Sequence, residues 1–316
     1  MQDIPIIDVS PLRSSDPAQR ASCAAVLGRT CRDIGFFYAT GHSIAPAIAS
    51  GIFDAARTFF ALPTEEKEEL SYAKSAHNRG YIGLGKERLE ATLPPDQKEA
   101  FNIGLELAPD DPELLAGKPF RGINLWPTLP GWRETALAYY EACTQLTVQI
   151  HRGFALDLGL EEEFFTPRID RPMTTLRLLH YPPGNGVDLG AGTHTDYGNL
   201  TILATDGVAG LQVRRRDGTW IDAPHVPGAF VCNIGDCLMR WTNDVYVSTP
   251  HRVQQPSSER YSVAYFCDPN PDAVVEVIPA CVPAGATPSY PPILGADYLR
   301  SRLDPTYNHW KASDVA

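Results

Sequence analysis

The sequence predicts an α+β protein, because helical patterns fill the first half of the chain and strand patterns fill the second. Apolar residues recur at helical spacing in residues 17–35, 44–62 and 131–159. Beyond Pro172 the pattern changes to short strands separated by turn residues. Helices followed by strands are the order of an α+β fold, and several short strands at close spacing favour a sandwich or barrel.

The N-terminal elements alternate between strand and helix. We expect a strand at residues 4–10 (IPIIDVS), a helix at 17–35 that a glycine ends, and a strand at 36–42 (FFYATGH). A second helix follows at 44–62 and stops at a proline. Residues 73–130 are rich in glycine and proline and give no clear assignment.

The longest helical pattern, at 131–159, precedes the strand block. The expected strands are short runs separated by turn residues, and these runs cover 174–182, 199–206, 210–224, 229–242 and 260–269. Within 210–224 the pair Asp217-Gly218 is typical of a hairpin turn, with the basic residues before it on the solvated edge. The segment 295–307 (GADYLRSRLDPTY) is typical of a C-terminal helix.

The composition limits the partners and the compartment. The 316-residue chain has a formal net charge of −11, which opposes binding to nucleic acid or to an anionic membrane. Its seven cysteines are widely scattered and form no C-x-x-C pair, so we expect reduced, mostly buried thiols. No signal-peptide pattern and no run of about 18 apolar residues occurs, so the sequence predicts a soluble, cytoplasmic protein.

Three residues of the strand block have the chemistry of a metal site, and we call them the triad. His194 and Asp196 are two apart, so in a strand their side chains would share one face. His251 enters its own strand directly after Pro250, a position where proline is tolerated. Two imidazoles and one carboxylate with open positions form the facial triad of non-heme Fe(II) oxygenases, and zinc is the competing metal.

A second group could hold an anion beside the metal. Arg260 and Ser262 share one strand face, and an arginine fork with a hydroxyl beside it suits a carboxylate. A buried guanidinium without a partner is costly, so a buried Arg260 would imply a resident acid or a bound anion. On another strand Tyr181 could donate to the same anion, and Arg177 could meet an acidic group of the substrate or cosubstrate. The alternatives are surface or rim positions for the arginines and a core position for the tyrosine.

Three aromatic residues are candidates for the wall of a pocket. Phe101, Trp241 and Phe266 could contact a substrate, although core packing accounts for each equally well. The glycine-rich run at 80–87 (GYIGLGKE) lacks the spacing of a phosphate-binding loop and would suit a flexible loop near the mouth of the barrel.

The motif formed by these residues resembles that of the iron- and 2-oxoglutarate-dependent dioxygenases, in the branch that includes isopenicillin N synthase. The residues that carry the resemblance are His194, Asp196, His251, Arg260 and Ser262. The segments IPIIDVS, CRDIGFFYATGH, FFALPTEEK, KEAFNIG and NLWP are also similar to that branch, so the resemblance covers nearly the whole chain. It implies a double-stranded β-helix, or jelly roll, flanked by N-terminal and C-terminal helices. We therefore expect an N-terminal region at 1–120 and a catalytic core at 121–316 that form effectively one structural unit.

The resemblance also implies cofactors and a reaction. Fe(II) would bind the triad, and the distal carboxylate of 2-oxoglutarate would bind Arg260 and Ser262, usually with the tyrosine that matches Tyr181. The implied reaction consumes O2 and 2-oxoglutarate, releases succinate and CO2, and oxidises a C–H bond of a small molecule. Hydroxylation is the default outcome, and desaturation and ring closure use the same residues.

One departure from the family pattern leaves an alternative open. Plant members commonly have asparagine two residues before the tyrosine, where this chain has Leu179. The chain could therefore be an Fe(II) oxidase of the isopenicillin N synthase type, in which similar residues hold the substrate's own carboxylate and no 2-oxoglutarate is used. A jelly-roll binding protein with a vestigial metal site is a third option, which the intact motif disfavours. Arg177 suggests a carboxylated substrate, and the sequence says nothing of the oligomeric state.

Overall fold

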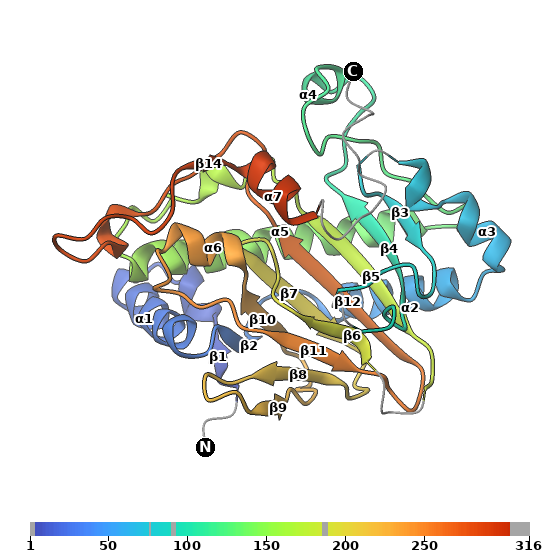
Figure 1. Cartoon of the computed structure of the whole chain (residues 1–316), viewed down its shortest axis with the longest axis horizontal. Helices are drawn as coiled ribbons and strands as arrows, with labels where there is room; N and C mark the ends of the chain where they lie inside the picture. Colours follow the sequence, from blue (N-terminus) through green and yellow to red (C-terminus); the bar gives the residue numbers. More distant parts are fainter. Residues whose placement is uncertain (1–3, 76, 90–92, 185–188, 304–316) are drawn as a thin grey trace.

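Two β-sheets that pack against each other form the centre of the protein (Figure 1). The computed structural model describes residues 4–75, 77–89, 93–184 and 189–303. In spatial order the large sheet consists of β1 (Ile6–Asp8), β2 (Phe36–Thr40), β10 (Phe230–Ile234), β7 (Leu200–Thr205), β12 (Arg260–Cys267), β5 (Thr175–Tyr181), β4 (Glu99–Gly104) and β3 (Gly80–Ile82). The small sheet consists of β6 (Leu189–His194), β11 (His251–Gln254), β8 (Leu211–Arg214) and β9 (Trp220–Asp222). A separate pair is formed by β13 (Val274–Val275) and β14 (Ile293–Leu294).

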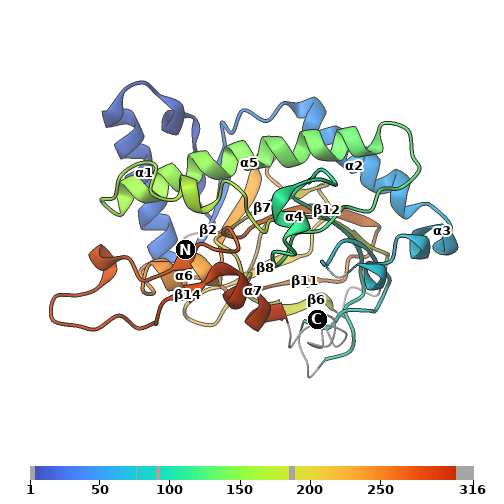
Figure 2. The same cartoon turned by 90° about the horizontal axis from the view of Figure 1, so that it is seen from above.

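Helices cover the outer face of the large sheet, away from the small sheet (Figure 2). The helices on this face are α1 (Pro17–Asp33), α2 (Pro46–Phe60) and the long α5 (Trp132–Asp157). The remaining α-helices of the described ranges are α3 (Thr64–Glu69), α4 (Pro112–Leu115), α6 (Asp236–Trp241) and α7 (Gly295–Leu303). The N-terminal strands β1–β4 belong to the same sheet as β5, β7, β10 and β12, so both halves of the chain build one sheet.

Local sequence sets where α1 begins and ends. The Asp16 side chain accepts a hydrogen bond from the backbone N–H of Ala18, and Pro17 occupies the first turn, where its missing N–H costs nothing. Gly35 follows the helix with φ +66°, a conformation that favours glycine, and a side chain there would meet the carbonyl of Val247. The chain can therefore turn directly into β2.

The apolar stripe of α5 contributes much of the core between the helices and the large sheet. Leu146, Ile150 and Phe154 are at most 1% exposed and share one cluster with Ile202 of β7 and Val263 of β12. Burial of each such side chain stabilises the fold by roughly 1.5–3 kcal/mol. This packing holds the strands that carry the site.

The α+β jelly-roll prediction is confirmed, but two local predictions are wrong. Residues 236–241 form the helix α6 instead of continuing the strand expected at 229–242. The strand ends at this point because the backbone turns away from the sheet. The N–H of Asp236 donates to the carbonyl of Asp196 and not to a neighbouring strand. Asp196 itself lies beyond the end of β6, so only His194 of this pair is in a strand.

All seven cysteines are buried and none forms a disulfide. Within the described parts of the chain, every helix is too short or too polar to cross a lipid bilayer.

Candidate active site

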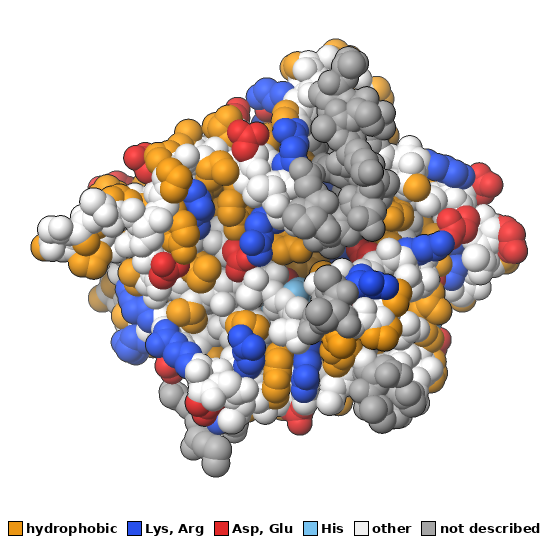
Figure 3. All heavy atoms as spheres, in the orientation of Figure 1, with side chains coloured by type: hydrophobic (Ala, Val, Ile, Leu, Met, Phe, Trp, Pro, Cys, Tyr) orange, Lys and Arg blue, Asp and Glu red, His pale blue; other side chains and the backbone are white. Residues whose placement is uncertain are grey.

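The triad lies in the wall of a cavity of about 170 Å³ between the two sheets. His194 is the last residue of β6 and His251 is the first of β11, and the two are direct partners in the antiparallel register. Nε2 of His194 lies 3.8 Å from Oδ1 of Asp196, and Nε2 of His251 lies 3.6 Å from the same oxygen. The three side chains thus converge on one point, and Figure 3 shows a histidine at the bottom of a hollow in this face of the molecule.

Backbone carbonyls orient both imidazole rings. Nδ1 of His194 lies 2.7 Å from the carbonyl oxygen of Gly192, and Nδ1 of His251 lies 3.1 Å from that of Thr249. A carbonyl can only accept, so each Nδ1 carries the proton and each Nε2 keeps its lone pair. Both lone pairs are directed to the point that the triad shares.

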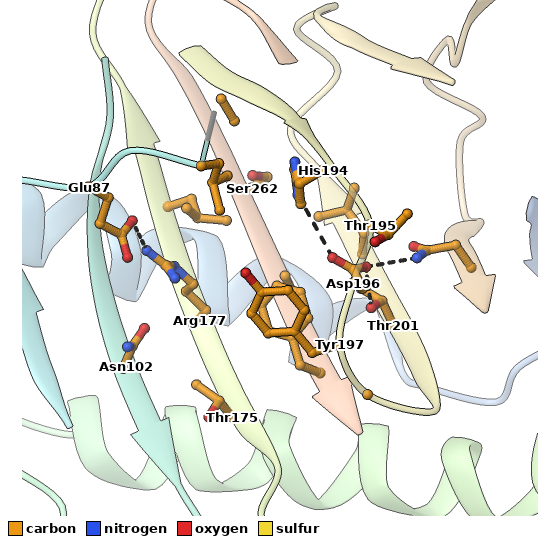
Figure 4. A pocket seen from close by; sticks show the side chains of 18 of the residues that line it. Glu87, Asn102, Thr175, Arg177, His194, Thr195, Asp196, Tyr197, Thr201 and Ser262 are labelled. Carbon is orange, nitrogen blue, oxygen red and sulfur yellow. Dashed lines mark hydrogen bonds and ion pairs between the residues drawn. The ribbon is translucent and has the colours of Figure 1, made fainter. Parts of the chain in front are cut away.

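The carboxylate of Asp196 is held in the form that binds a metal. Its Oδ2 accepts hydrogen bonds from Thr201 at 2.5 Å and from Asn233 at 2.7 Å, which leaves Oδ1 for a metal (Figure 4). Burial acts to raise the pKa of Asp196, but the two imidazoles and these hydrogen bonds together lower it below the usual value. Burial, with the neighbouring His251, lowers the pKa of His194 to about 3. A neutral imidazole beside an ionised carboxylate is the state that binds a divalent cation, so these residues fit the metal.

A second carboxylate, that of Asp236, binds the loop that follows β6 and contains Thr195 and Asp196. The hydroxyl of Thr195, between His194 and Asp196, donates to Oδ2 of Asp236 at 3.0 Å. The same oxygen accepts a hydrogen bond of 2.6 Å from Arg302 on α7. The C-terminal helix is therefore linked to the metal-binding loop through Asp236, which no sequence pattern indicated.

The arginine–serine pair lies in the same cavity as the triad. Arg260 is only 1% exposed, and its guanidinium donates to the carbonyl of Val208 at 3.2 Å and to the hydroxyl of Ser262 at 3.3 Å. Among the described residues no carboxylate pairs with Arg260. Tyr181 lies opposite Arg260 on β5, where its ring packs 4.8 Å from the guanidinium carbon, and Leu179 lies opposite Ser262. The cavity thus contains a buried guanidinium whose remaining N–H groups can donate to a ligand.

Another side of the cavity is polar, and we call Asn78, Arg79, Glu87, Asn102 and Arg177 the polar wall. Figure 4 labels Glu87, Asn102 and Arg177 of this set. Arg177 lines the cavity as its strand face predicted, but its guanidinium forms a short ion pair with Glu87. Lys98 also contacts Glu87, at 3.5 Å, and binds Asp96.

The rest of the polar wall could not be predicted from the sequence, because residues 73–130 give no clear secondary-structure assignment. A strand assignment for EAFNIG would have helped, since alternation puts Asn102 on the face opposite Phe101.

Of the three aromatic candidates, only Phe266 lines the cavity. It shares the inward face of β12 with Arg260 and Ser262. Phe101 points the other way and packs against Phe59 and Trp132, with ring centroids 4.6 and 5.3 Å apart.

Trp241 belongs to α6 and packs against Phe165 in the core. The pocket positions expected for Phe101 and Trp241 are therefore wrong. Apolar side chains that do line the cavity include Phe120, Met173, Leu299 and Leu303.

Comparison with known proteins defines the class. Residues 172–269 match the 2OG-Fe(II) oxygenase superfamily, and residues 4–129 match the family described as the N-terminal region of the non-haem dioxygenase in morphine synthesis. The chain belongs to the 2OG-Fe(II) oxygenase superfamily.

Similar proteins cover nearly the full chain. The 2-oxoglutarate-Fe(II) type oxidoreductase hxnY of Emericella nidulans is 40% identical, over 98% of this chain and 91% of that protein. A homoarginine-6-hydroxylase of Glycine max is 39% identical, over 86% of this chain and 87% of that protein. A full-length Neurospora crassa protein, solved with alpha-KG and thymine, has a TM-score of 0.86 at 33% identity and covers 96% of this chain and 97% of its own.

These findings settle the cofactors. The protein is an Fe(II)- and 2-oxoglutarate-dependent dioxygenase that uses O2 and acts on a small molecule. Nothing in the comparisons supports the 2-oxoglutarate-independent oxidase.

Proposed function

We propose that the triad binds Fe(II), that Arg260 and Ser262 hold the distal carboxylate of 2-oxoglutarate, and that the protein hydroxylates a C–H bond of a small polar molecule. The observation that carries this proposal is the buried guanidinium of Arg260. It is 1% exposed and has no carboxylate partner in the described ranges, although it lies in the same cavity as the triad. A buried cation in this state is stabilised by an anionic ligand.

The residues have complementary roles in this proposal. When bound, Fe(II) and 2-oxoglutarate supply the oxidation, in which O2 is consumed and 2-oxoglutarate becomes succinate and CO2. The fork of Arg260 offers parallel N–H donors to the distal carboxylate. The hydroxyl of Ser262 accepts from Arg260, so its own proton is available to the same carboxylate. The apolar residues beside them exclude water from the reacting centre.

The substrate side of the proposal rests on the polar wall. Two of the relatives are named with small polar molecules, thymine in one structure and homoarginine in one enzyme name. Arg177 suggested a carboxylated substrate, but its pairing with Glu87 favours a substrate without a free carboxylate at that position.

An anaerobic titration tests the proposal. Fe(II) is added to the metal-free protein, and 2-oxoglutarate follows while the weak visible absorption band of an iron-chelated keto acid is monitored. A band that saturates with 2-oxoglutarate in the wild type, and needs far more cosubstrate in Arg260→Ala, supports it. Iron binding without a band, or equal titrations in both proteins, would overturn the assignment of Arg260.

A further inference from the structure

We propose that Asp268 binds a cationic nitrogen group of the substrate, such as an amine, an amidine or a guanidine, and thereby selects basic substrates. This inference rests on the proposed function and names the substrate class of that same site.

Asp268 continues the inward row of side chains on β12. The members of this row alternate along the chain and all line the cavity: Arg260, Ser262, Ala264, Phe266 and Asp268. Hydrogen bonds fix the backbone on both sides of Asp268. The carbonyl of Cys267 accepts from the N–H of Asn199 at 2.7 Å, and the carbonyl of Pro269 accepts from that of Met173 at 3.1 Å. The carboxyl group therefore has a defined place in the cavity.

The triad lies between Asp268 and the residues assigned to 2-oxoglutarate. Phe266 is the register partner of Thr201, whose hydroxyl donates to Asp196, so the metal-binding carboxylate lies at the level of Phe266. Arg260 precedes this level on β12, whereas Asp268 follows it by two residues, roughly 7 Å along the chain. In the proposed function 2-oxoglutarate extends from Arg260 to the triad, which leaves the side with Asp268 to the substrate.

The carboxyl group of Asp268 has no partner of its own and is within reach of a ligand. Asp268 is 5% exposed, and neither of its carboxyl oxygens accepts a hydrogen bond or forms an ion pair with a residue that the structure describes. Neither oxygen is sealed off from the cavity, in contrast to the enclosed unpartnered atoms of Arg79 and Asn102. A substrate in the cavity can therefore contact this carboxyl group directly.

The surroundings of Asp268 lack a positive charge. Burial and the carboxylate of Asp196 raise the pKa of Asp268, because no cation of the described chain lies close enough to stabilise its charge. The buried guanidinium of Arg79 lies over Gly104 on β4, and β5 separates β4 from β12, so roughly 10 Å lie between the two strands. A substrate cation would supply the missing charge and hold Asp268 in its ionised form.

Three probes of one shape test the inference on the protein loaded with Fe(II) and 2-oxoglutarate under anaerobic conditions. They are benzamidine, a cation, benzamide, its neutral analogue, and benzoate, an anion. The benzene ring suits the apolar side chains of Met173, Phe266 and Leu299 in the cavity. In calorimetric titrations we expect benzamidine to bind about tenfold more tightly than benzamide, the factor of a charge-assisted hydrogen bond, and benzoate to bind most weakly. Equal binding of benzamidine and benzamide, preferred binding of benzamide or benzoate, or no binding of benzamidine would each overturn the inference.

Two variants assign the preference to one carboxyl group. Asp268→Asn keeps the shape of the side chain and removes its charge, so benzamidine should bind about tenfold more weakly and benzamide should bind as before. Asp272→Asn is the matched control, because Asp272 lies on the same segment with its side chain 68% exposed and does not line the cavity in the described structure. A preference for benzamidine that persists in Asp268→Asn, or that is lost equally in Asp272→Asn, would contradict the assignment.

The 2-oxoglutarate absorption band is recorded in every sample and separates the two proposals. A normal band in Asp268→Asn shows that the site is folded, so a lost preference for benzamidine reports recognition. A normal band in the wild type without that preference refutes the inference alone, whereas absence of the band in the wild type refutes the proposed function.

Discussion

Replacement of Arg260 by alanine removes the charge to which we assign the distal carboxylate of 2-oxoglutarate. The side chain is buried, and its protein hydrogen bonds to Val208 and Ser262 leave donors for two charge-assisted bonds to a carboxylate. Loss of one partner from such a buried pair costs about 2–5 kcal/mol. The dissociation constant of 2-oxoglutarate should therefore rise roughly 30-fold to 4000-fold, since about 1.4 kcal/mol corresponds to a factor of ten.

Two measurements check this prediction. The anaerobic absorption titration gives the affinity for 2-oxoglutarate, and a separate Fe(II) titration should give equal iron affinity in Arg260→Ala and wild type. Thermal unfolding is the second assay. At a ligand concentration about 100 times the dissociation constant, 2-oxoglutarate should stabilise the wild type by about 2.7 kcal/mol, and the same concentration should stabilise the variant far less.

The matched control is Arg252→Ala. Arg252 is on β11, next to His251, but its Nε binds Gln212 at 2.9 Å and its guanidinium lies 4.2 Å from the centre of the Trp220 ring. It does not line the cavity in the described structure. This variant should bind 2-oxoglutarate like the wild type. Unchanged affinity in Arg260→Ala, or an equal loss in both variants, would refute the role assigned to Arg260.

Three further predictions concern the support of the site. Gly235→Ala should weaken Fe(II) binding and destabilise the fold by about 1–3 kcal/mol in urea unfolding, because the new methyl group would lie 2.2 Å from the carbonyl oxygen of Gly198. Asp236→Asn should weaken Fe(II) binding by about tenfold in an iron titration, because it loses the charge that holds Thr195 and the C-terminal helix; unchanged affinity would contradict this. Burial lowers the pKa of His151 to about 4, so the folded state resists protonation and stability falls as the pH drops from about 6.5 toward 4. His151→Leu should reduce the fall between pH 7 and pH 5 by about 2 kcal/mol, measured by urea unfolding at both values.

Most of the fold could be predicted because its elements have strong local signals. The helix α1 has a capping aspartate, an initial proline and a terminal glycine, and α5 has a continuous apolar stripe. The failure at 236–241 has a non-local cause. The apolar run from Phe230 reads as one strand, but the bond from the N–H of Asp236 to the carbonyl of Asp196 comes from a distant loop. Local propensity contains no information about that partner.

Some residues of the site could likewise be predicted from the sequence, whereas others could not. Arg260 and Ser262 could be proposed because alternation places both on one face of their strand. The triad could be proposed because two imidazoles and a carboxylate are metal ligands, although Asp196 lies beyond the end of its expected strand. The polar wall could not, because Glu87 and Asn102 come from a glycine- and proline-rich stretch without clear periodicity. Only the sheet register, which pairs Asn102 with Arg177, brings them into the cavity.

The metal and cosubstrate residues and the substrate-facing residues lie in different parts of the fold. The residues assigned to iron and 2-oxoglutarate lie on or beside β5, β6, β11 and β12, where strand pairing fixes their spacing. Glu87 instead lies in the connection after β3, and Leu299 and Leu303 lie on the C-terminal helix. Connections tolerate substitution better than paired strands do. Substrate choice can therefore change at these positions while the metal and cosubstrate sites stay intact, so a substitution such as Glu87→Gln should leave the 2-oxoglutarate band unchanged.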